Sequence, residues 1–193
     1  PGRELNGVHF AMEFLKQQNK RVSNLTIDEN DILTTGKNVV VIGGGDTGAD
    51  CVGTSNRHGA KSITQLELLP QPPRERTESM PWPNWPMILR TSTSHDEGCE
   101  RMWSVQTKEF IGDAEGNLTG LKIVELEWDK PTDGKMPKFI EKEGSERILP
   151  AELILIAAGF LHPQHEGMLD DMGVEYDERG NVKANTSKYS TSV

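Results

Sequence analysis

Cysteine is scarce in this chain of 193 residues, which contains only Cys51 and Cys99. The two form no CxxC pair, so the sequence excludes a disulfide framework and a cluster of thiolate ligands. We expect both thiols to be reduced and the protein to be cytoplasmic. No apolar run comes near the roughly 18 residues of a membrane-spanning helix, so no membrane span is predicted.

Basic residues are outnumbered as well. The chain has 21 Lys and Arg residues against 30 Asp and Glu residues, which gives a formal net charge of -9. Such a balance argues against general binders of nucleic acids or membrane surfaces, because both need clustered positive charge. It leaves room for one local basic site that binds a phosphate.

The apolar content is also low, with 34% hydrophobic residues and a mean hydropathy of -0.58. Either the chain has long polar loops, or it is a piece of a larger protein whose packing partner is absent. The chain begins at Pro1 instead of Met and stops at Val193 without a cap or a charged tail. These ends favour the second interpretation.

Strand and helix patterns alternate in the first third of the chain. Residues 8–18 predict a short amphipathic helix, and residues 19–30 a polar loop. The β-branched run at 38–42 is typical of a strand buried on both faces of a parallel sheet. A glycine-rich turn follows at once, then a helix over 46–57 and a second strand over 62–69.

The middle of the chain is rich in proline. Six of the 11 prolines fall between residues 70 and 86, together with Trp82 and Trp85. Proline at this density predicts an extended surface loop. Because exposed tryptophans are costly, we expect the loop to pack on this domain or on an absent neighbour.

The hydrophobic period changes to two after Met102. The predicted strands are 104–111, 121–128 and 138–143, with turns at 112–117 and 131–136. A buried strand over 152–158 follows and ends at Gly159. Together these elements predict an α/β fold: a Rossmann-like, three-layer parallel sheet with an inserted antiparallel β-meander.

The glycine-rich turn from Gly43 to Gly48 has the sequence GGGDTG and lies between a strand and a helix, the context that makes a GxGxxG pattern informative. Gly43 makes the tight turn, Gly45 lets the backbone approach a pyrophosphate, and Gly48 lets the helix pack on the sheet. The helix N-terminus offers unpaired N–H groups to the phosphates. The alternative is a glycine-rich turn without a ligand.

The remaining residues of the turn, Gly44, Asp46 and Thr47, complete the predicted cofactor site. Asp46 and Thr47 complement the helix dipole, and a catalytic role for Asp46 is the weaker alternative. Gly159 either allows close approach of the nicotinamide or of a linker, or simply ends a strand.

The preference between NAD and NADP depends on the residues after the second strand. Glu67 lies near the position from which an acidic side chain binds the ribose hydroxyls, but Leu68 and Leu69 follow it, so its place at the strand tip is open. Arg74 and Arg76 lie beyond the strand and Arg57 at the end of the first helix, where they can pair with a 2′-phosphate or be ordinary surface residues. These arginines favour NADPH.

Four stretches of the chain resemble the small (beta) subunit of glutamate synthase. The first is the turn and helix VIGGGDTGADCVGTS with NRHGA, at 41–60. The others are PGREL with GVHFAMEFL at the start, the loop PWPNWP at 81–86, and AAGFL with Pro163. The resemblance covers essentially the whole chain.

The resemblance implies a parent enzyme in which the NADPH domain is inserted within an FAD domain. NADPH reduces FAD, iron–sulfur clusters carry the electrons to the large subunit, and glutamate forms there from 2-oxoglutarate and glutamine-derived ammonia. This chain has no second GxGxxG for FAD and no cysteines for clusters. We therefore expect an excised NADPH-binding lobe at 20–165, with 1–19 and 166–193 belonging to or bordering the FAD domain. Its partners would be that domain and the large subunit.

Hydride transfer needs the nicotinamide held near the flavin, and the contribution of the protein is positioning. Without the flavin domain we expect this chain to bind the dinucleotide but to be inactive alone, so no catalytic residue is predicted. His162 and His165 with Glu166 form an HxxH pattern, but Pro163 places it in a loop and no metal site is expected; Cys99 is interpreted as a plain thiol. Two alternatives remain. One is the electron-input subunit of another flavin and iron–sulfur oxidoreductase, of dihydropyrimidine dehydrogenase-like or ferredoxin:NADP type. The other is a non-catalytic module that uses its tryptophan loop for protein contacts.

Overall fold

The computed structural model of the chain describes residues 1–27, 30–78, 80–84, 87–129, 138–185 and 187–193. By their contacts the residues fall into two compact units, Pro1–Ala158 and Gly159–Val193. The first unit contains both sheets and the glycine turn, and the second is a short segment with one helix.

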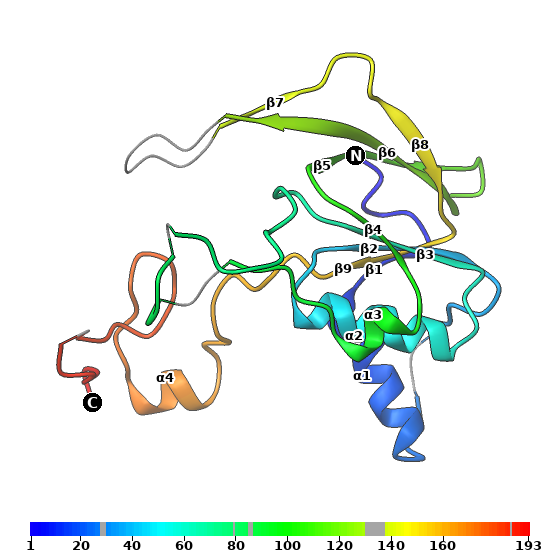
Figure 1. Cartoon of the computed structure of the whole chain (residues 1–193). Helices are drawn as coiled ribbons and strands as arrows, with labels where there is room; N and C mark the ends of the chain where they lie inside the picture. The colour runs from blue at the N-terminus through cyan, green and yellow to red at the C-terminus, as the bar shows by residue number, and fades with distance from the viewer. Residues whose placement is uncertain (28–29, 79, 85–86, 130–137, 186) are drawn as a thin grey trace. The chain divides into compact units, whose positions relative to one another are not determined.

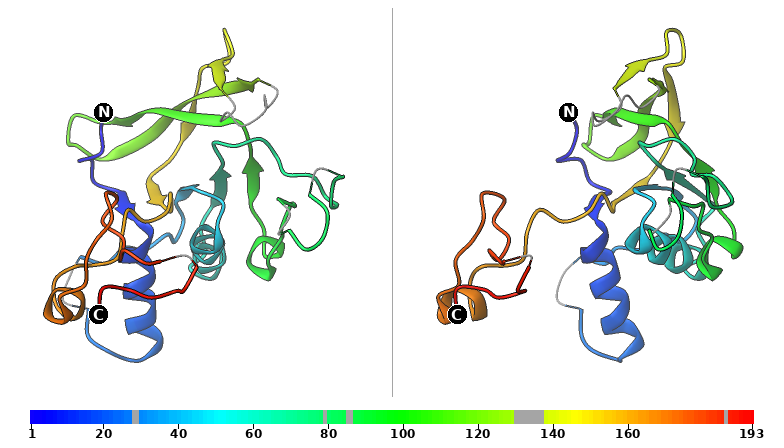
Figure 2. Two further views of the ribbon diagram at one scale, coloured as in Figure 1. Left: turned by 90° about the vertical axis from the view of Figure 1, so that its left-hand side faces the viewer. Right: turned by 60° about the vertical axis from the view of Figure 1, so that its left-hand side comes forward.

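The first unit is built on a parallel sheet of five strands. Their order is β1 (Val8–Phe10), β9 (Leu153–Ile156), β2 (Asn38–Ile42), β3 (Ser62–Leu66) and β4 (Glu100–Met102). Helices α1 (Ala11–Val22), α2 (Asp46–Arg57) and α3 (Thr93–Asp96) lie along one face of this sheet (Figure 1). Helices α1 and α2 contact each other there (Figure 2).

The opposite face of the parallel sheet is covered by an antiparallel sheet (Figure 1). Strand β6 (Leu118–Trp128) is central and pairs with β5 (Val105–Gly112), β7 (Phe139–Glu141) and β8 (Arg147–Pro150). The three layers confirm the predicted Rossmann-like fold with an antiparallel sheet inserted between parallel strands.

Strand β2 shows why its sequence lacks polar alternation. Val39 and Val41 pack into the core on the helix side of the sheet, with Phe14 of α1. Val40 packs into the second core, beneath the meander, with Leu121. Both faces of β2 are therefore buried, and a strand in this position requires an unbroken apolar run.

The prediction of a helix from residue 8 is wrong in its first turn. Val8–Phe10 is strand β1, whose register pairs Val8 with Ile154 and Phe10 with Ile156, and the helix runs from Ala11 to Val22. The strand arises from pairing with a segment far away in the sequence, which a local amphipathic pattern does not reveal.

Other element limits also shift. The second strand ends at Leu66 instead of residue 69, the third meander strand is confined to Phe139–Glu141, and the strand predicted over 152–158 is Leu153–Ile156. Elements α3, β4, β8 and α4 were not predicted. The turn expected at 131–136 lies outside the described residues, as does Trp85, whereas Trp82 is 82% exposed.

The second unit contains α4 (Met168–Met172) and two isolated antiparallel bridges, Tyr176 with Val182 and Asn185 with Ser190. The assignment of residues 1–19 and 166–193 to a flavin domain stays a prediction. Within the first unit, residues 8–10 are hydrogen-bonded into the parallel sheet as β1, and α1 contacts α2.

Candidate functional site

The glycine turn leaves β2 at the carboxyl edge of the parallel sheet. Gly43 has a φ of +117°, and a Cβ on it would lie 2.2 Å from the carbonyl oxygen of Ala157. Its N–H donates to the carbonyl of Leu66 at 2.9 Å, which ties the turn to β3. A Cβ on Gly48 would lie 2.2 Å from the carbonyl oxygen of Gly43. Both positions therefore require glycine, one for the turn and one for the approach of α2.

Gly45 is different, because no described atom beyond the adjacent residues lies within 4 Å of the place that its Cβ would take. It is exposed and is the N-cap of α2, with φ -75° and ψ -174° and no side-chain cap. Asp46 and Thr47 form the first turn, and the N–H of Ala49 already donates to Gly45 at 3.0 Å. The N–H groups that precede Ala49 at the start of this 12-residue helix have no side-chain cap, an arrangement that suits an anion.

Gly44 makes room for Glu67. A Cβ on Gly44 would lie 1.1 Å from Oε1 of Glu67, so the carboxylate occupies the space that a side chain there would fill. Glu67 is the first residue after β3, and its N–H donates to Met102 at 2.8 Å while its carbonyl accepts from Val105 at 3.1 Å. Glu67 therefore does lie at the strand tip, facing the turn. Burial raises the pKa of its carboxyl, and the nearby Arg101 opposes that rise.

A chain of hydrogen bonds supports the turn from the helix side of the sheet. The fully buried Gln65 donates from Nε2 to the carbonyl of Gly43 at 3.0 Å. Its Oε1 lies 2.9 Å from Nε2 of His95, whose Nδ1 accepts from the N–H of Ser92 at 3.1 Å. Because Nδ1 accepts, Nε2 carries the proton that Gln65 receives.

The sequence offers little signal for this support. Gln65 is a lone polar residue in a strand, and His95 stands in a segment with no apolar period, 30 residues away. Burial, and secondarily Arg101, lowers the pKa of His95, while Asp96 acts in the opposite direction. The neutral imidazole that the hydrogen bonds require is therefore favoured.

The three arginines predicted for the 2′-phosphate are not brought together. Arg57 forms an ion pair with Glu97. Arg76 donates from Nη1 to the carbonyls of Met80 at 3.0 Å and Asn84 at 2.7 Å, which holds its own loop. Arg74 is an exposed residue of the same loop. Gly159 is exposed at the start of the second unit, with φ +92° and no described atom within 4 Å of a Cβ.

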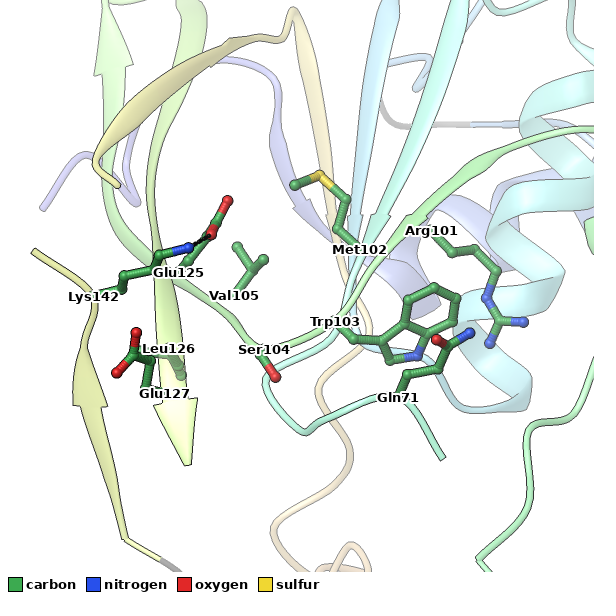
Figure 3. Close-up of a pocket in the computed structure, with 10 residues that line it drawn as sticks. All are labelled: Gln71, Arg101, Met102, Trp103, Ser104, Val105, Glu125, Leu126, Glu127 and Lys142. Carbon is green, nitrogen blue, oxygen red and sulfur yellow. Dashed lines mark hydrogen bonds and ion pairs between the residues drawn. The ribbon is translucent and has the colours of Figure 1, made fainter. Parts of the chain in front are cut away.

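A cleft of about 460 Å³ lies at the carboxyl end of β4, where Arg101, Met102 and Trp103 line it (Figure 3). Arg101, which was not predicted from the sequence, pairs in register with Gln65. Its guanidinium lies 5.0 Å from the ring centre of Trp103. Figure 3 shows Arg101, Trp103 and Gln71 on one side of the cleft and Glu125 with Lys142 on the other. Among the described residues, Nε of Arg101 and Nε1 of Trp103 are buried without a hydrogen-bond partner.

Within the described part of the chain, no group of three or more His, Cys, Asp or Glu side chains is placed to hold a metal ion. His162 and His165 stack on each other at 4.5 Å, and His165 stacks on Tyr176 at 4.0 Å. Among the same described residues, no helix has the length and apolar content needed to cross a membrane.

The chain is similar in sequence to glutamate synthases. It is 47% identical to the glutamate synthase [NADPH] small chain of Mycobacterium tuberculosis, over the whole of this chain and 39% of that protein. It is 45% identical to the glutamate synthase [NADH] of Schizosaccharomyces pombe, over the whole of this chain and 9% of that protein. The chain thus spans well under half of these relatives. The resemblance to the glutamate synthase small chain is confirmed.

Among solved structures, the chain is similar to Mycobacterium tuberculosis FprA in complex with NADPH. The TM-score is 0.60 and the identity 13%, over 96% of this chain and 51% of that one. A similar match is an FAD-dependent pyridine nucleotide-disulphide oxidoreductase from Desulfovibrio vulgaris, with a TM-score of 0.51 and 19% identity, over 99% of this chain and 39% of that one. At these identities the likeness shows the fold.

A family model describes the same relationship over nearly the full sequence. The model of the pyridine nucleotide-disulphide oxidoreductases matches residues 4–193, which includes the glycine turn, the meander and the second unit. With the parallel sheet, the glycine turn and the relatives in agreement, this chain belongs to the pyridine nucleotide-disulphide oxidoreductase family.

Proposed function

We propose that the first unit docks a reduced nicotinamide dinucleotide on the turn Gly43–Gly48, as the nucleotide-binding part of a glutamate synthase small chain. The observation that carries this proposal is the open N-terminus of α2 at Gly45, where no side chain caps the first N–H groups within the described structure. Pyrophosphate fits such a site because it brings negative charge to unpaired donors.

The residues in and around the turn have different roles in the proposed site. Gly43 and Gln65 hold the backbone in its sharp turn, and Gly45 leaves space for the phosphates. Asp46 and Thr47 complete the first turn of α2 and are part of the proposed contact surface. The helix end favours a charge by about 0.3–1 kcal/mol when exposed, so affinity must come from the whole dinucleotide and not from this contact alone.

The bound nucleotide supplies the hydride, and the protein supplies its position. The acceptor is proposed to be an FAD held by the parent protein outside this chain, with Gly159 at the start of the second unit allowing the backbone to pass close to the nicotinamide. Because no residue of the turn has to donate or accept a proton in this role, we propose no catalytic acid, base or nucleophile.

The role of the parent follows from its relatives and is part of the same proposal. Electrons would pass from FAD through iron–sulfur clusters to a large subunit, where glutamate forms from 2-oxoglutarate and glutamine, in the cytoplasm. The two cysteines of this chain are a buried residue, Cys51, and the partly buried Cys99, so the clusters would belong to other parts of the assembly. The partners proposed are therefore the flavin domain and the large subunit.

Titration of the purified chain with NADPH and with NADH, followed by thermal unfolding, tests the docking role. A ligand at about 100 times its dissociation constant stabilises the folded state by about 2.7 kcal/mol, which raises the unfolding temperature by several degrees. A shift that saturates with at least one of the two nucleotides is expected. If neither nucleotide produces a shift, docking is wrong and a non-catalytic module becomes the better account.

A further inference from the structure

The backbone of Glu67 is hydrogen-bonded to the end of β4 and to the start of β5. Its N–H donates to Met102 at 2.8 Å and its carbonyl accepts from Val105 at 3.1 Å, so its backbone cannot slide along the strand. Its carboxylate lies over Gly44, in the space of the missing Cβ. A carboxylate is thereby fixed at the end of β3, beside the phosphate-binding turn.

When a dinucleotide lies across the turn, the carboxylate of Glu67 is next to the adenosine ribose. A carboxylate there accepts hydrogen bonds from the ribose hydroxyls, as NADH presents them. A 2′-phosphate replaces one of these hydroxyls with a group of about two negative charges and no donor. Beside a partly buried carboxylate this substitution places like charges together and removes a hydrogen bond.

Two of the three arginines that would offset the 2′-phosphate are engaged elsewhere, and the third, Arg74, is exposed on the loop that Arg76 holds. Arg57 is paired with Glu97, and Arg76 holds the carbonyls of Met80 and Asn84. The two residues that follow Glu67 are Leu68 and Leu69, each 47% exposed. The tip of the strand therefore presents a carboxylate and two apolar side chains.

Arg101 is the cation that acts on Glu67. It lowers the pKa of the carboxyl against the effect of burial, and thus favours the charged form that a ribose hydroxyl would meet. Its own guanidinium donates from Nη1 to the carbonyl of Arg90 at 3.0 Å and lies over the ring of Trp103. Arg101 thus offsets the charge of Glu67, and one cation cannot also offset the two charges of a phosphate.

We infer that Glu67 makes this site select NADH over NADPH, in place of the NADPH preference expected from the three arginines. The inference rests on the proposed docking function and names the substrate of that site. The names of the relatives do not decide the matter, since NADPH occurs in one and NADH in another.

The test is to measure dissociation constants for NADH and NADPH at one fixed ionic strength. The unmodified chain should bind NADH at least about tenfold more tightly than NADPH, a difference that corresponds to ~1.4 kcal/mol. Glu67→Gln should weaken NADH and bring the ratio towards one, because the amide keeps the size of the side chain and removes its charge. Glu67→Ser should do the same if the amide disturbs the packing.

Glu100→Gln is the matched control, since Glu100 is an exposed carboxylate on β4 and its loss should leave the ratio unchanged. Equal or tighter binding of NADPH by the unmodified chain would overturn the inference and leave docking intact. A ratio that does not move in either Glu67 variant would overturn it as well. The absence of binding by both nucleotides would instead refute the docking function itself.

Discussion

The side-chain amide of Gln65 donates to the carbonyl of Gly43 at 3.0 Å, and so joins β3 to the phosphate-binding turn. Gln65 has no exposed surface, and its oxygen is occupied by His95. This link lets a residue that cannot contact a ligand determine the shape of the turn that does.

Gln65→Leu should therefore loosen the turn without touching the nucleotide. Loss of the amide leaves the carbonyl of Gly43 and the N–H of His95 unpaired, which costs about 1–3 kcal/mol for each buried group. We expect a lower free energy of unfolding and weaker binding of NADH and NADPH by the same factor. Denaturant unfolding and titration with both nucleotides measure this, with Gln164→Leu, an exposed position, as the control. A loss confined to one nucleotide would contradict the role given to Gln65.

His95 should make this support sensitive to acid. Its pKa is lowered, chiefly by burial, so protonation is resisted in the folded protein. The stabilisation is present above the ordinary pKa of about 6.5 and is lost as the pH falls below that value. The unfolding free energy should decline between pH 7 and pH 5 with a steeper slope in the unmodified chain than in His95→Gln. Identical slopes would show that His95 does not contribute.

The same methyl group should cost much more stability at Gly48 than at Gly45. At Gly48 a Cβ meets the backbone oxygen of Gly43 at 2.2 Å, whereas at Gly45 it meets open space. Gly48→Ala should lower the free energy of unfolding by about 1–3 kcal/mol, and Gly45→Ala should lower it by less, about 0.5–1 kcal/mol, because only the N-cap preference for glycine is lost. Denaturant unfolding of the two variants checks this. A greater loss of stability in Gly45→Ala would mean that the turn is packed differently.

Cys51 should resist thiol reagents while the protein is folded. Burial, aided by the charge of Asp50, raises the pKa of its thiol to about 12. The pKa of Cys99 is also raised by burial, but Arg101 acts against that rise, and Cys99 is partly exposed. Alkylation at pH 8 followed by peptide mass analysis should find Cys99 modified first. The neutral Cys51 thiol also stabilises the fold below the unfolded pKa of about 9, and this contribution should be lost as the pH rises towards 12. Early modification of Cys51 would contradict its burial.

The sequence predicts best those parts of the fold that neighbouring residues determine. The succession of β2, the glycine turn and α2 can be recognised because all its signals lie within residues 38–57. Strand β1 was predicted as helix, since its partner β9 stands near the other end of the first unit. The predicted fold class is nevertheless correct, because it depends on the apolar runs of β2 and β9 and on the period-two pattern of the meander.

The site shows the same division. The glycines were predicted from their spacing, and the space around Gly43, Gly45 and Gly48 is consistent with the roles expected of them. The sequence could not show that Arg57 would meet Glu97, which is 40 residues away. Nor could it show that Gln65 and His95 would meet beneath the turn. Interactions between distant segments depend on the sheet register, which a single sequence does not reveal.

The docking of a dinucleotide at the open end of α2 is the central claim, and Gly45→Val tests it most directly. A Cβ at position 45 has no described atom beyond the adjacent residues within 4 Å, so the chain has room for a valine there. The valine side chain would occupy the space that we propose for the pyrophosphate. Calorimetric titration of the unmodified chain with NADH should show saturable binding. The variant should lose about 1 kcal/mol of stability, because valine is a poorer N-cap than glycine, and it should bind NADH at least about tenfold more weakly, a difference of ~1.4 kcal/mol. Equal affinity in the two proteins would contradict the claim.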